Sequence, residues 1–158
     1  MSDLIIDKKY YNTLDIEGFS KMMNSPSYCY KFYWLEAIVQ LISANKTEAT
    51  YDEIINKMIS NAWYPVLEYH IHLSGIYGKD IIKDNLERAV LRLQELSQLA
   101  NNASDIEITN NLHEFSEDKE LRFYKKELTK NVPYKALSGF ANRGSEKINL
   151  DSSAGRLR

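Results

Sequence analysis

The residues with the clearest potential for chemistry are a glutamate and two histidines at alternate positions, Glu68, His70 and His72. On a β-strand their side chains would share one face, whereas on a helix residues two apart do not face each other. Zinc and catalytic metals normally need three or four convergent ligands, and nothing in the spacing adds His113 to the set. We therefore expect the histidines at the surface or the core edge, with no metal or cofactor. A metal-dependent enzyme using His70 and His72 is kept as an alternative.

Cys29 is the only cysteine of the chain, and as a nucleophile it would need a histidine as its base. It lies between two tyrosines at the start of an apolar segment, where a lone cysteine usually serves as a small buried hydrophobe. The chain has neither a glycine-rich phosphate loop nor a G-x-S-x-G nucleophile turn. Paired carboxylates such as Asp52 and Glu53 fall at predicted helix starts, where negative charge is favourable. We therefore predict no catalytic residue.

A basic stretch near the C-terminus is the main candidate for binding. Four of its cations recur at spacings of three and four, so they share a helix face, and Phe123, Tyr124 and Tyr134 lie among them. Such a face can neutralise phosphates while aromatic rings stack on unpaired bases. The alternative is a solvated face with Tyr124 in the core. The predicted nucleic-acid-binding residues, which would contact phosphates without reading the base sequence, are Arg122, Lys125, Lys126, Lys130, Lys135 and Arg143.

The composition is that of a globular domain. Of the 158 residues 44% are apolar and 27% are charged, and glycine and proline are sparse, which favours helices over turn-rich β-structure. The net charge of −2 divides into −8 over residues 1–118 and +6 over residues 119–158. This asymmetry either marks an anionic partner or is balanced by acidic neighbours within the fold. The sequence has no secretory signal, no long apolar span and no cysteine pair, which predicts a cytoplasmic protein without a membrane partner.

Hydrophobic periodicity predicts an all-α protein, a compact bundle of five to seven helices with a flexible C-terminal tail. We expect an N-terminal arm over residues 1–14, a helical domain over 15–140 and the tail over 141–158. Residues 67–74 alternate as a strand would, but we predict a helix there because an isolated strand would lack a partner. The predicted helices span residues 15–23, 28–44, 51–62, 66–76, 80–100, 105–113 and 116–130.

Several local signals set the ends of these helices. Thr50 and Glu53 form a capping box at the start of the third helix, and Pro65 interrupts the chain beyond its end. Ser116 is the predicted cap of the last helix, which Pro133 stops. In the helix over residues 80–100, the charged side chains are expected on the outside.

The helix over residues 28–44 is apolar around most of its circumference and is therefore predicted to be central and buried. Trp34 and Trp63 are expected in the core. Ile106 is expected inside the bundle together with Ile108 and Leu112. The first apolar stripe of the helix over residues 28–44 consists of Tyr28, Phe32, Leu35, Val39 and Ile42.

Three short segments occur in an informative order. They read SYCYKFYW over residues 27–34, AWYPV over residues 62–66 and NVPYKALS over residues 131–138. Over about residues 20–140 this order resembles the helical N-terminal region of a group of bacterial HNH-endonuclease-domain proteins. The resemblance implies a bacterial, cytoplasmic protein involved in DNA transactions or phage defence.

In the HNH family a metal-dependent nuclease module, which uses histidines, follows the helical region. This chain has no histidine after His113, so the nuclease chemistry is not carried over. The chain is then either a stand-alone relative or a part of something longer. We expect a non-catalytic module that positions DNA or docks a partner such as a nuclease module. The alternative is a protein-interaction module or homodimer that binds no nucleic acid.

Overall fold

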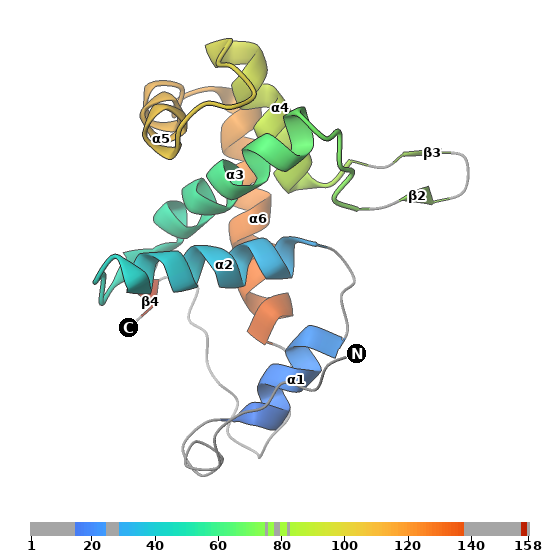
Figure 1. Cartoon of the computed structure of the whole chain (residues 1–158), viewed down its shortest axis with the longest axis vertical. Helices are drawn as coiled ribbons and strands as arrows, with labels where there is room; N and C mark the ends of the chain where they lie inside the picture. The colour runs from blue at the N-terminus through green and yellow to red at the C-terminus, as the bar shows by residue number, and fades with distance from the viewer. Residues whose placement is uncertain are drawn as a thin grey trace.

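The computed structural model describes residues 15–24, 29–74, 76–77, 80–81, 83–137 and 156–157. Helices dominate this part of the chain, which confirms the predicted all-α bundle (Figure 1). No helix in the described part is both long enough and apolar enough to cross a membrane. The predicted arm and most of the predicted tail lie outside the described residues. The six helices are α1 (Ile16–Asn24), α2 (Tyr30–Ser43), α3 (Tyr51–Leu67), α4 (Asn85–Ser97), α5 (Asp105–Glu114) and α6 (Lys119–Leu137).

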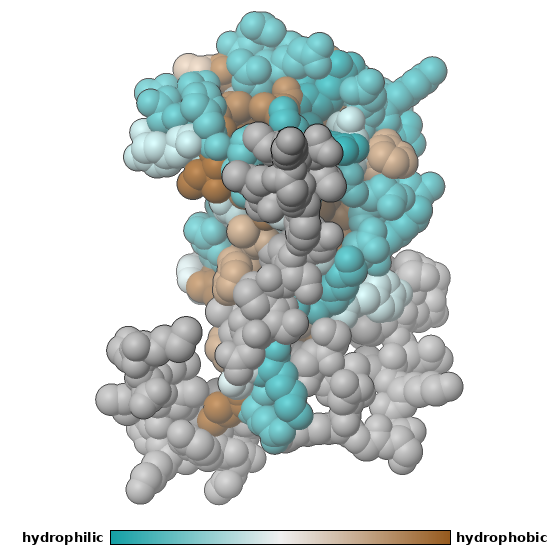
Figure 2. Space-filling view, turned by 90° about the vertical axis from the view of Figure 1, so that its right-hand side faces the viewer, coloured by the Kyte–Doolittle hydropathy of each residue, from teal (hydrophilic) through white to brown (hydrophobic). Residues whose placement is uncertain are grey.

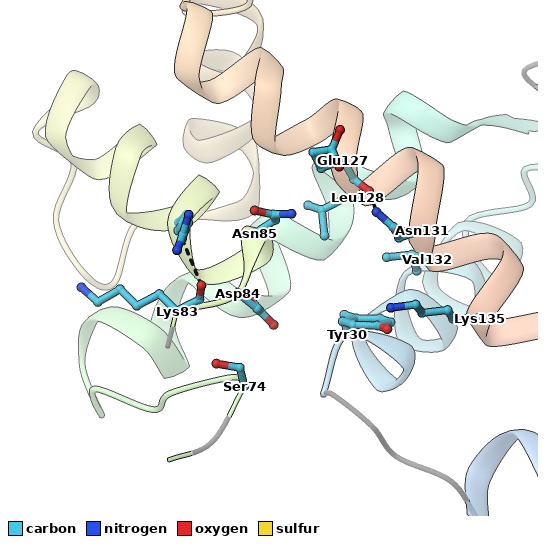
Figure 3. A pocket seen from close by; sticks show the side chains of 11 residues that line it. Tyr30, Ser74, Lys83, Asp84, Asn85, Glu127, Leu128, Asn131, Val132 and Lys135 are labelled. Carbon is cyan, nitrogen blue, oxygen red and sulfur yellow. Dashed lines mark hydrogen bonds between the residues drawn. The ribbon is translucent and has the colours of Figure 1, made fainter. Parts of the chain in front are cut away.

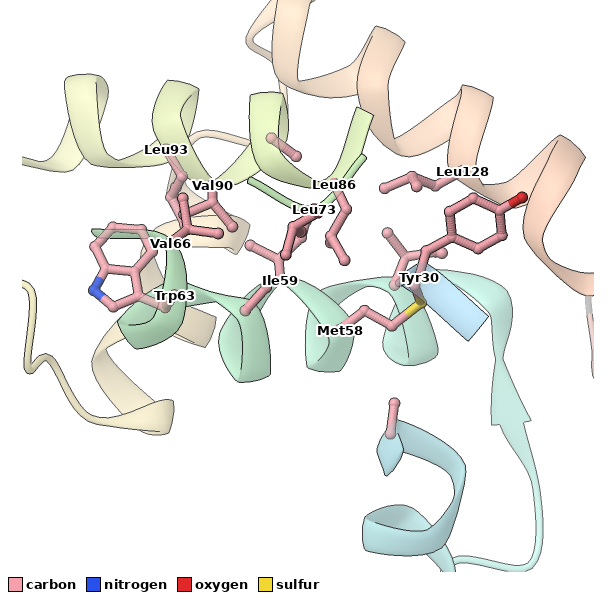
Figure 4. Packing of buried hydrophobic residues seen from close by; sticks show 14 of the residues in the cluster. Tyr30, Met58, Ile59, Trp63, Val66, Leu73, Leu86, Val90, Leu93 and Leu128 are labelled. Atoms are coloured by element: carbon pink, nitrogen blue, oxygen red, sulfur yellow. The ribbon is translucent and has the colours of Figure 1, made fainter. Parts of the chain in front are cut away.

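Helix α3 is the centre of the bundle, because α2, α4, α5 and α6 all contact it. Its buried side chains face those of α4, with residues of α2 and α6 completing the core (Figure 4). Trp34 and Trp63 are both buried, as predicted, and the indole nitrogen of Trp63 donates to the carbonyl of Ala100 over 3.1 Å. The core residues labelled in Figure 4 are Tyr30, Met58, Ile59, Trp63, Val66, Leu73, Leu86, Val90, Leu93 and Leu128.

The capping box at the start of α3 is present as predicted. The Thr50 hydroxyl accepts from the Glu53 backbone, and the Glu53 carboxylate accepts from the Thr50 backbone. The predicted end at Ala62 is wrong, because α3 continues through Pro65 to Leu67. Pro65 lacks the backbone N–H that would donate to the carbonyl four residues earlier. Because α3 ends two residues later, this proline disturbs only the last turn of the helix. Burial of the two residues that follow Pro65 keeps the last turn against the core.

The predicted helix over residues 66–76 is wrong. His70 has a φ of 52°, in the left-handed region, which is incompatible with a continuing α-helix. Beyond it, β2 (Ile76–Tyr77) pairs with β3 (Asp80–Ile81) as a short antiparallel hairpin, so the strand partner lies only a few residues along the chain. Helix α4 consequently begins at Asn85 rather than at residue 80. A second pair joins β1 (Ala49–Thr50) to β4 (Arg156–Leu157).

The apolar stripe of α2 faces outward, which contradicts the predicted burial. Phe32, Val39 and Ile42 are 40%, 53% and 63% exposed. The core side of α2 is formed instead by Tyr30, Lys31, Trp34 and Ala37. Tyr28, which was predicted to extend the stripe, lies outside the described residues. A helix that is apolar on most sides does not reveal from its sequence which side meets the core.

Helices α5 and α6 differ from their predictions in detail. Ile106 is 71% exposed, because Ile108 and Leu112, four residues apart, form the core side of α5. Asp118 rather than Ser116 caps α6, since its carboxylate accepts from the Leu121 backbone over 2.9 Å. Helix α6 also continues through the buried Pro133 to Leu137.

Candidate nucleic-acid interface

Helix α6 carries five of the six predicted binding residues, and Arg143 lies outside the described residues. Arg122, Lys126 and Lys130 follow one another at intervals of four and are all exposed. Lys125 does not share their exposure, because its side chain is only 14% exposed at the edge of the core. Its ammonium lies 2.6 Å from the carboxylate of Asp52 on α3. The shared basic face is thus narrower than the sequence spacing predicts.

Two cations of this face form ion pairs with acidic neighbours. Arg122 pairs with Glu117 over 3.1 Å, and Lys130 pairs with Glu127 over 2.7 Å. Among the described residues, no carboxylate lies within ion-pairing distance of Lys126. Exposed ion pairs contribute only about 0–1 kcal/mol each, so a phosphate can compete for these cations.

An exposed aromatic ring lies beside the cations. Phe123 is 54% exposed and packs edge-to-face on Tyr124, with ring centroids 5.7 Å apart. Phe123, Arg122, Lys125 and Lys126 line one open hollow of about 560 Å³ near the start of α6. On the face seen in Figure 2, many of the described residues are hydrophilic, with hydrophobic ones between them. The hollow thus brings cations and an exposed aromatic ring together.

Lys135 faces a different site, a pocket of about 290 Å³ between α2, α4 and α6 (Figure 3). Its ammonium lies 5.9 Å from the centre of the Tyr30 ring, at the wall of this pocket. Lys135 is exposed, but it therefore does not lie with Arg122, Lys126 and Lys130, although all four residues are on the same helix. The pocket is also lined by Ser74, Asp84 and Asn131.

Asp84 is the N-cap of α4 and points into this pocket (Figure 3). One carboxylate oxygen, Oδ1, accepts from the Glu87 backbone over 2.8 Å. The other, Oδ2, is buried and has no hydrogen-bond partner among the described residues. Burial, followed by the negative charge of Glu87, raises the pKa of Asp84 above its ordinary value of 3.8, although backbone hydrogen bonds oppose this shift.

Glu87 was expected on the outside of its helix, and this expectation is wrong because the residue is buried. Its carboxylate accepts from the Leu73 backbone over 3.2 Å and lies 3.0 Å from Nδ1 of His72. These contacts tie the loop after α3 to the first turn of α4. A buried carboxylate with such partners cannot be recognised from helical spacing alone, because its partners come from another segment.

The residues that could have formed a metal site are not brought together. His70 and Glu68 are exposed, and Glu68 accepts instead from Asn101. His72 is engaged with Glu87, while His113 lies on α5. In the described part of the chain, no group of three or more histidine, cysteine or carboxylate side chains could hold a metal ion.

Cys29 precedes α2 and is exposed, which contradicts the predicted buried position. Partial desolvation and the negative charge of Asp84 raise the pKa of its thiol above the ordinary value of 9.0. A raised pKa disfavours the thiolate, which is the nucleophilic form. The chemistry around Cys29 therefore does not favour a nucleophile.

Comparisons with protein-family models, with curated proteins and with solved structures find no match for this chain. The resemblance to the N-terminal region of HNH-endonuclease-domain proteins thus rests on its three sequence segments. Much of those segments is core, including Trp34, Trp63 and Val132. The resemblance therefore concerns residues that pack the bundle more than residues that present a binding surface.

Proposed function

We propose that this chain is a non-catalytic helical module that positions DNA through the exposed side of α6. The observation that carries the proposal is the hollow in which exposed Phe123 lies beside Arg122, Lys125 and Lys126. Cations at this spacing suit backbone phosphates, and an exposed ring suits an unpaired base. Contacts of these kinds hold a strand in place without reading its sequence.

The charge of α6 supports an anionic partner, although the chain as a whole is slightly acidic. This helix carries six cations against two carboxylates. Its exposed ion pairs are weak enough to be exchanged for contacts with phosphates, whereas the pair of Lys125 with Asp52 is partly protected from solvent. Binding should therefore weaken steeply with salt, as counterions compete for the same cations.

The biological context of the proposal comes from the sequence resemblance. We infer a bacterial, cytoplasmic setting in DNA transactions or phage defence, in which a nuclease module would supply the chemistry. The geometry of the described residues does not favour a catalytic role for this chain itself. The thiol of Cys29 is not activated, because its pKa is raised, and the candidate metal ligands do not lie together.

The proposal is tested by fluorescence anisotropy with labelled DNA of about 20 nucleotides, single-stranded and duplex, between about 50 mM and 200 mM salt. Lys126→Glu should weaken binding about tenfold at the lower salt and reduce the salt slope by about one. Lys83→Glu is the matched control, because it makes the same change in net charge at an exposed lysine beside the other pocket. It should leave affinity within about twofold.

Phe123→Ala separates stacking from charge. It should weaken single-strand binding by about 1–3 kcal/mol and change duplex binding little, because only unpaired bases offer a free face. Tyr69→Ala, at another exposed aromatic residue, is its control. Absence of binding to either DNA at low salt would refute the proposed function. An equal loss of DNA affinity in Lys83→Glu and Lys126→Glu would refute the assigned site.

A further inference from the structure

The outward side of α2 carries an apolar stripe with the spacing of a coiled-coil seam. Phe32, Leu35, Val39 and Ile42 follow one another at intervals of three, four and three, which are the a and d positions of two heptads. Three of the four are large hydrophobic side chains that remain exposed. A stripe of this kind is shaped to receive the side chains of a second helix.

The stripe is presented on a helix that is already fixed in place. The opposite side of α2 is buried in the core through Tyr30, Trp34 and Ala37, and the helix contacts both α3 and α6. Burial of the stripe is therefore not needed to hold α2 in the bundle. Contiguous exposed apolar residues on a rigid element are characteristic of interaction sites.

An apolar groove continues the stripe at its C-terminal end. This groove has a volume of about 190 Å³ and lies between α2, the residues leading into β1 and the first turn of α3. Its apolar wall is formed by Ile38, Leu41, Ile42, Ala49 and Ile54. The largest side chain of the stripe, Phe32, lies at the opposite end of the helix. One surface thus carries a bulky projecting group at one end and an apolar hollow at the other.

We propose that this surface binds a second copy of the chain, with the two α2 helices antiparallel about a twofold axis that passes the exposed side of α2 midway between Leu35 and Val39. This arrangement places Phe32 opposite Ile42 of the partner subunit, beside its groove, and Leu35 opposite Val39 of the partner subunit. Twofold symmetry repeats both contacts. Phe32 at one end of α2 can meet the groove at the other end of a second α2 only when the two helices run in opposite directions. An isologous interface, in which both subunits use the same surface, has this arrangement, so we infer that the occupant is a second copy.

The charges of the surface agree with self-association. The charged residue on the exposed side of α2 is Glu36, which accepts a hydrogen bond from Gln40 over 3.4 Å, and the groove adds one residue of each sign, Lys46 and Glu48. Two copies can therefore meet without facing rows of like charge. A helix of 14 residues is about 21 Å long, so the contact is smaller than the ~800 Å² per partner of a standard interface. We accordingly expect a dimer of micromolar rather than nanomolar affinity.

Sedimentation velocity of the full chain from about 5 µM to 200 µM tests the proposal, with the expected result a rise from monomer to dimer in this range. Val39→Glu should shift the midpoint at least tenfold, since it places a charge in the centre of the stripe. Ile106→Glu is the matched control at an exposed isoleucine on α5 and should leave the midpoint unchanged. Far-UV circular dichroism shows whether each variant is folded. A wild-type chain that stays monomeric throughout would overturn the proposal without reference to any variant.

Disulfide trapping tests the direction of the helices in a Cys29→Ser background. A mixture of Leu35→Cys and Val39→Cys chains should form the crossed disulfide, because these positions face each other in the antiparallel pair. Val39→Cys chains alone should cross-link less efficiently, because position 39 faces its own copy only in a parallel, in-register pair. Preferential cross-linking of Val39→Cys with itself would overturn the antiparallel arrangement. A dimer that persists unchanged in Val39→Glu would overturn the surface.

Discussion

Replacing Asp84 by asparagine should make the protein more stable at neutral pH, whereas replacing it by alanine should remove a helix cap. Asp84 caps α4 through Oδ1, which accepts from the Glu87 backbone over 2.8 Å. Asparagine caps helices about as well as aspartate does, so this contact survives the first substitution. The asparagine does, however, remove the negative charge of the carboxylate. The Oδ2 atom of that carboxylate is buried and has no hydrogen-bond partner among the described residues.

The pH dependence follows from the direction of the pKa shift. Burial and the neighbouring Glu87 raise the pKa of Asp84 above 3.8, so the folded protein holds this proton at a pH where the unfolded chain has released it. The protonated carboxyl stabilises the fold fully below 3.8, and this contribution is lost as the pH rises through the folded-state pKa. The advantage of Asp84→Asn should therefore be larger at pH 7 than near pH 3.8, and it should fade as the pH falls toward 3.8.

The size of the cap contribution comes from comparing the two variants. Both lack the charge, so the difference between Asp84→Asn and Asp84→Ala reports the hydrogen bond to the Glu87 backbone, about 1 kcal/mol. For a chain of this length, that difference corresponds to about 2–4 °C in the melting temperature. Urea unfolding followed by circular dichroism measures both variants, and equal m-values would confirm that the unfolded states are comparable.

Asp15→Asn is the matched control. Asp15 accepts from the Gly18 backbone over 2.9 Å at the start of α1, and the residue three positions after it is a glycine rather than a buried glutamate. We expect no gain in stability from this variant. The reasoning would be refuted if Asp84→Asn were as destabilised as Asp84→Ala at pH 7, or if its advantage increased on acidification.

Two further predictions concern polar contacts between residues far apart in the sequence. Arg92 donates to both carboxylate oxygens of Asp118, over 3.1 and 2.7 Å, and these bonds are the main cause that lowers the Asp118 pKa to about 2. Arg92→Ala should destabilise the fold at pH 7, and the loss should shrink as the pH falls below 3.8 toward 2, which urea unfolding at both ends of this range would detect. Glu87→Ala should cost about 2–3 kcal/mol, because it leaves the Leu73 amide and His72 without their acceptor. Glu87→Gln should cost less, and a thermal melt in which the two variants are equal would contradict this assignment.

Local signals predicted those parts of the fold that depend on neighbouring residues. The Thr50 capping box and helix α5 are formed within a few residues, and their predicted starts agree with the structure. The hairpin after Gly75 was missed because each strand has only two residues, too few for the alternating pattern to be read. Pro65 and Pro133 are typical helix breakers, but burial of neighbouring residues outweighs the loss of a single hydrogen bond at each position.

The candidate site was predictable only where exposure follows from helical spacing. Arg122, Lys126 and Lys130 lie together as their spacing indicates. Lys125 does not lie with them, because it forms an ion pair with Asp52, which is distant in the sequence. The ammonium of Lys135 lies over the ring of Tyr30 instead. The apolar stripe of α2 could be recognised from the sequence, but not the fact that it faces outward. That choice depends on which side of α2 fits α3 and α6, and this is a property of the assembled bundle.

The central position of α3 has a consequence for how the molecule opens. Since α2, α4, α5 and α6 all pack against this helix, a fluctuation that releases any one of them still leaves α3 covered by the others. Its backbone is exposed to solvent only when the bundle separates as a whole. We therefore expect α3 to open only in global unfolding, whereas α5, whose main contacts among the helices are with α3 and α4, can loosen at lower cost.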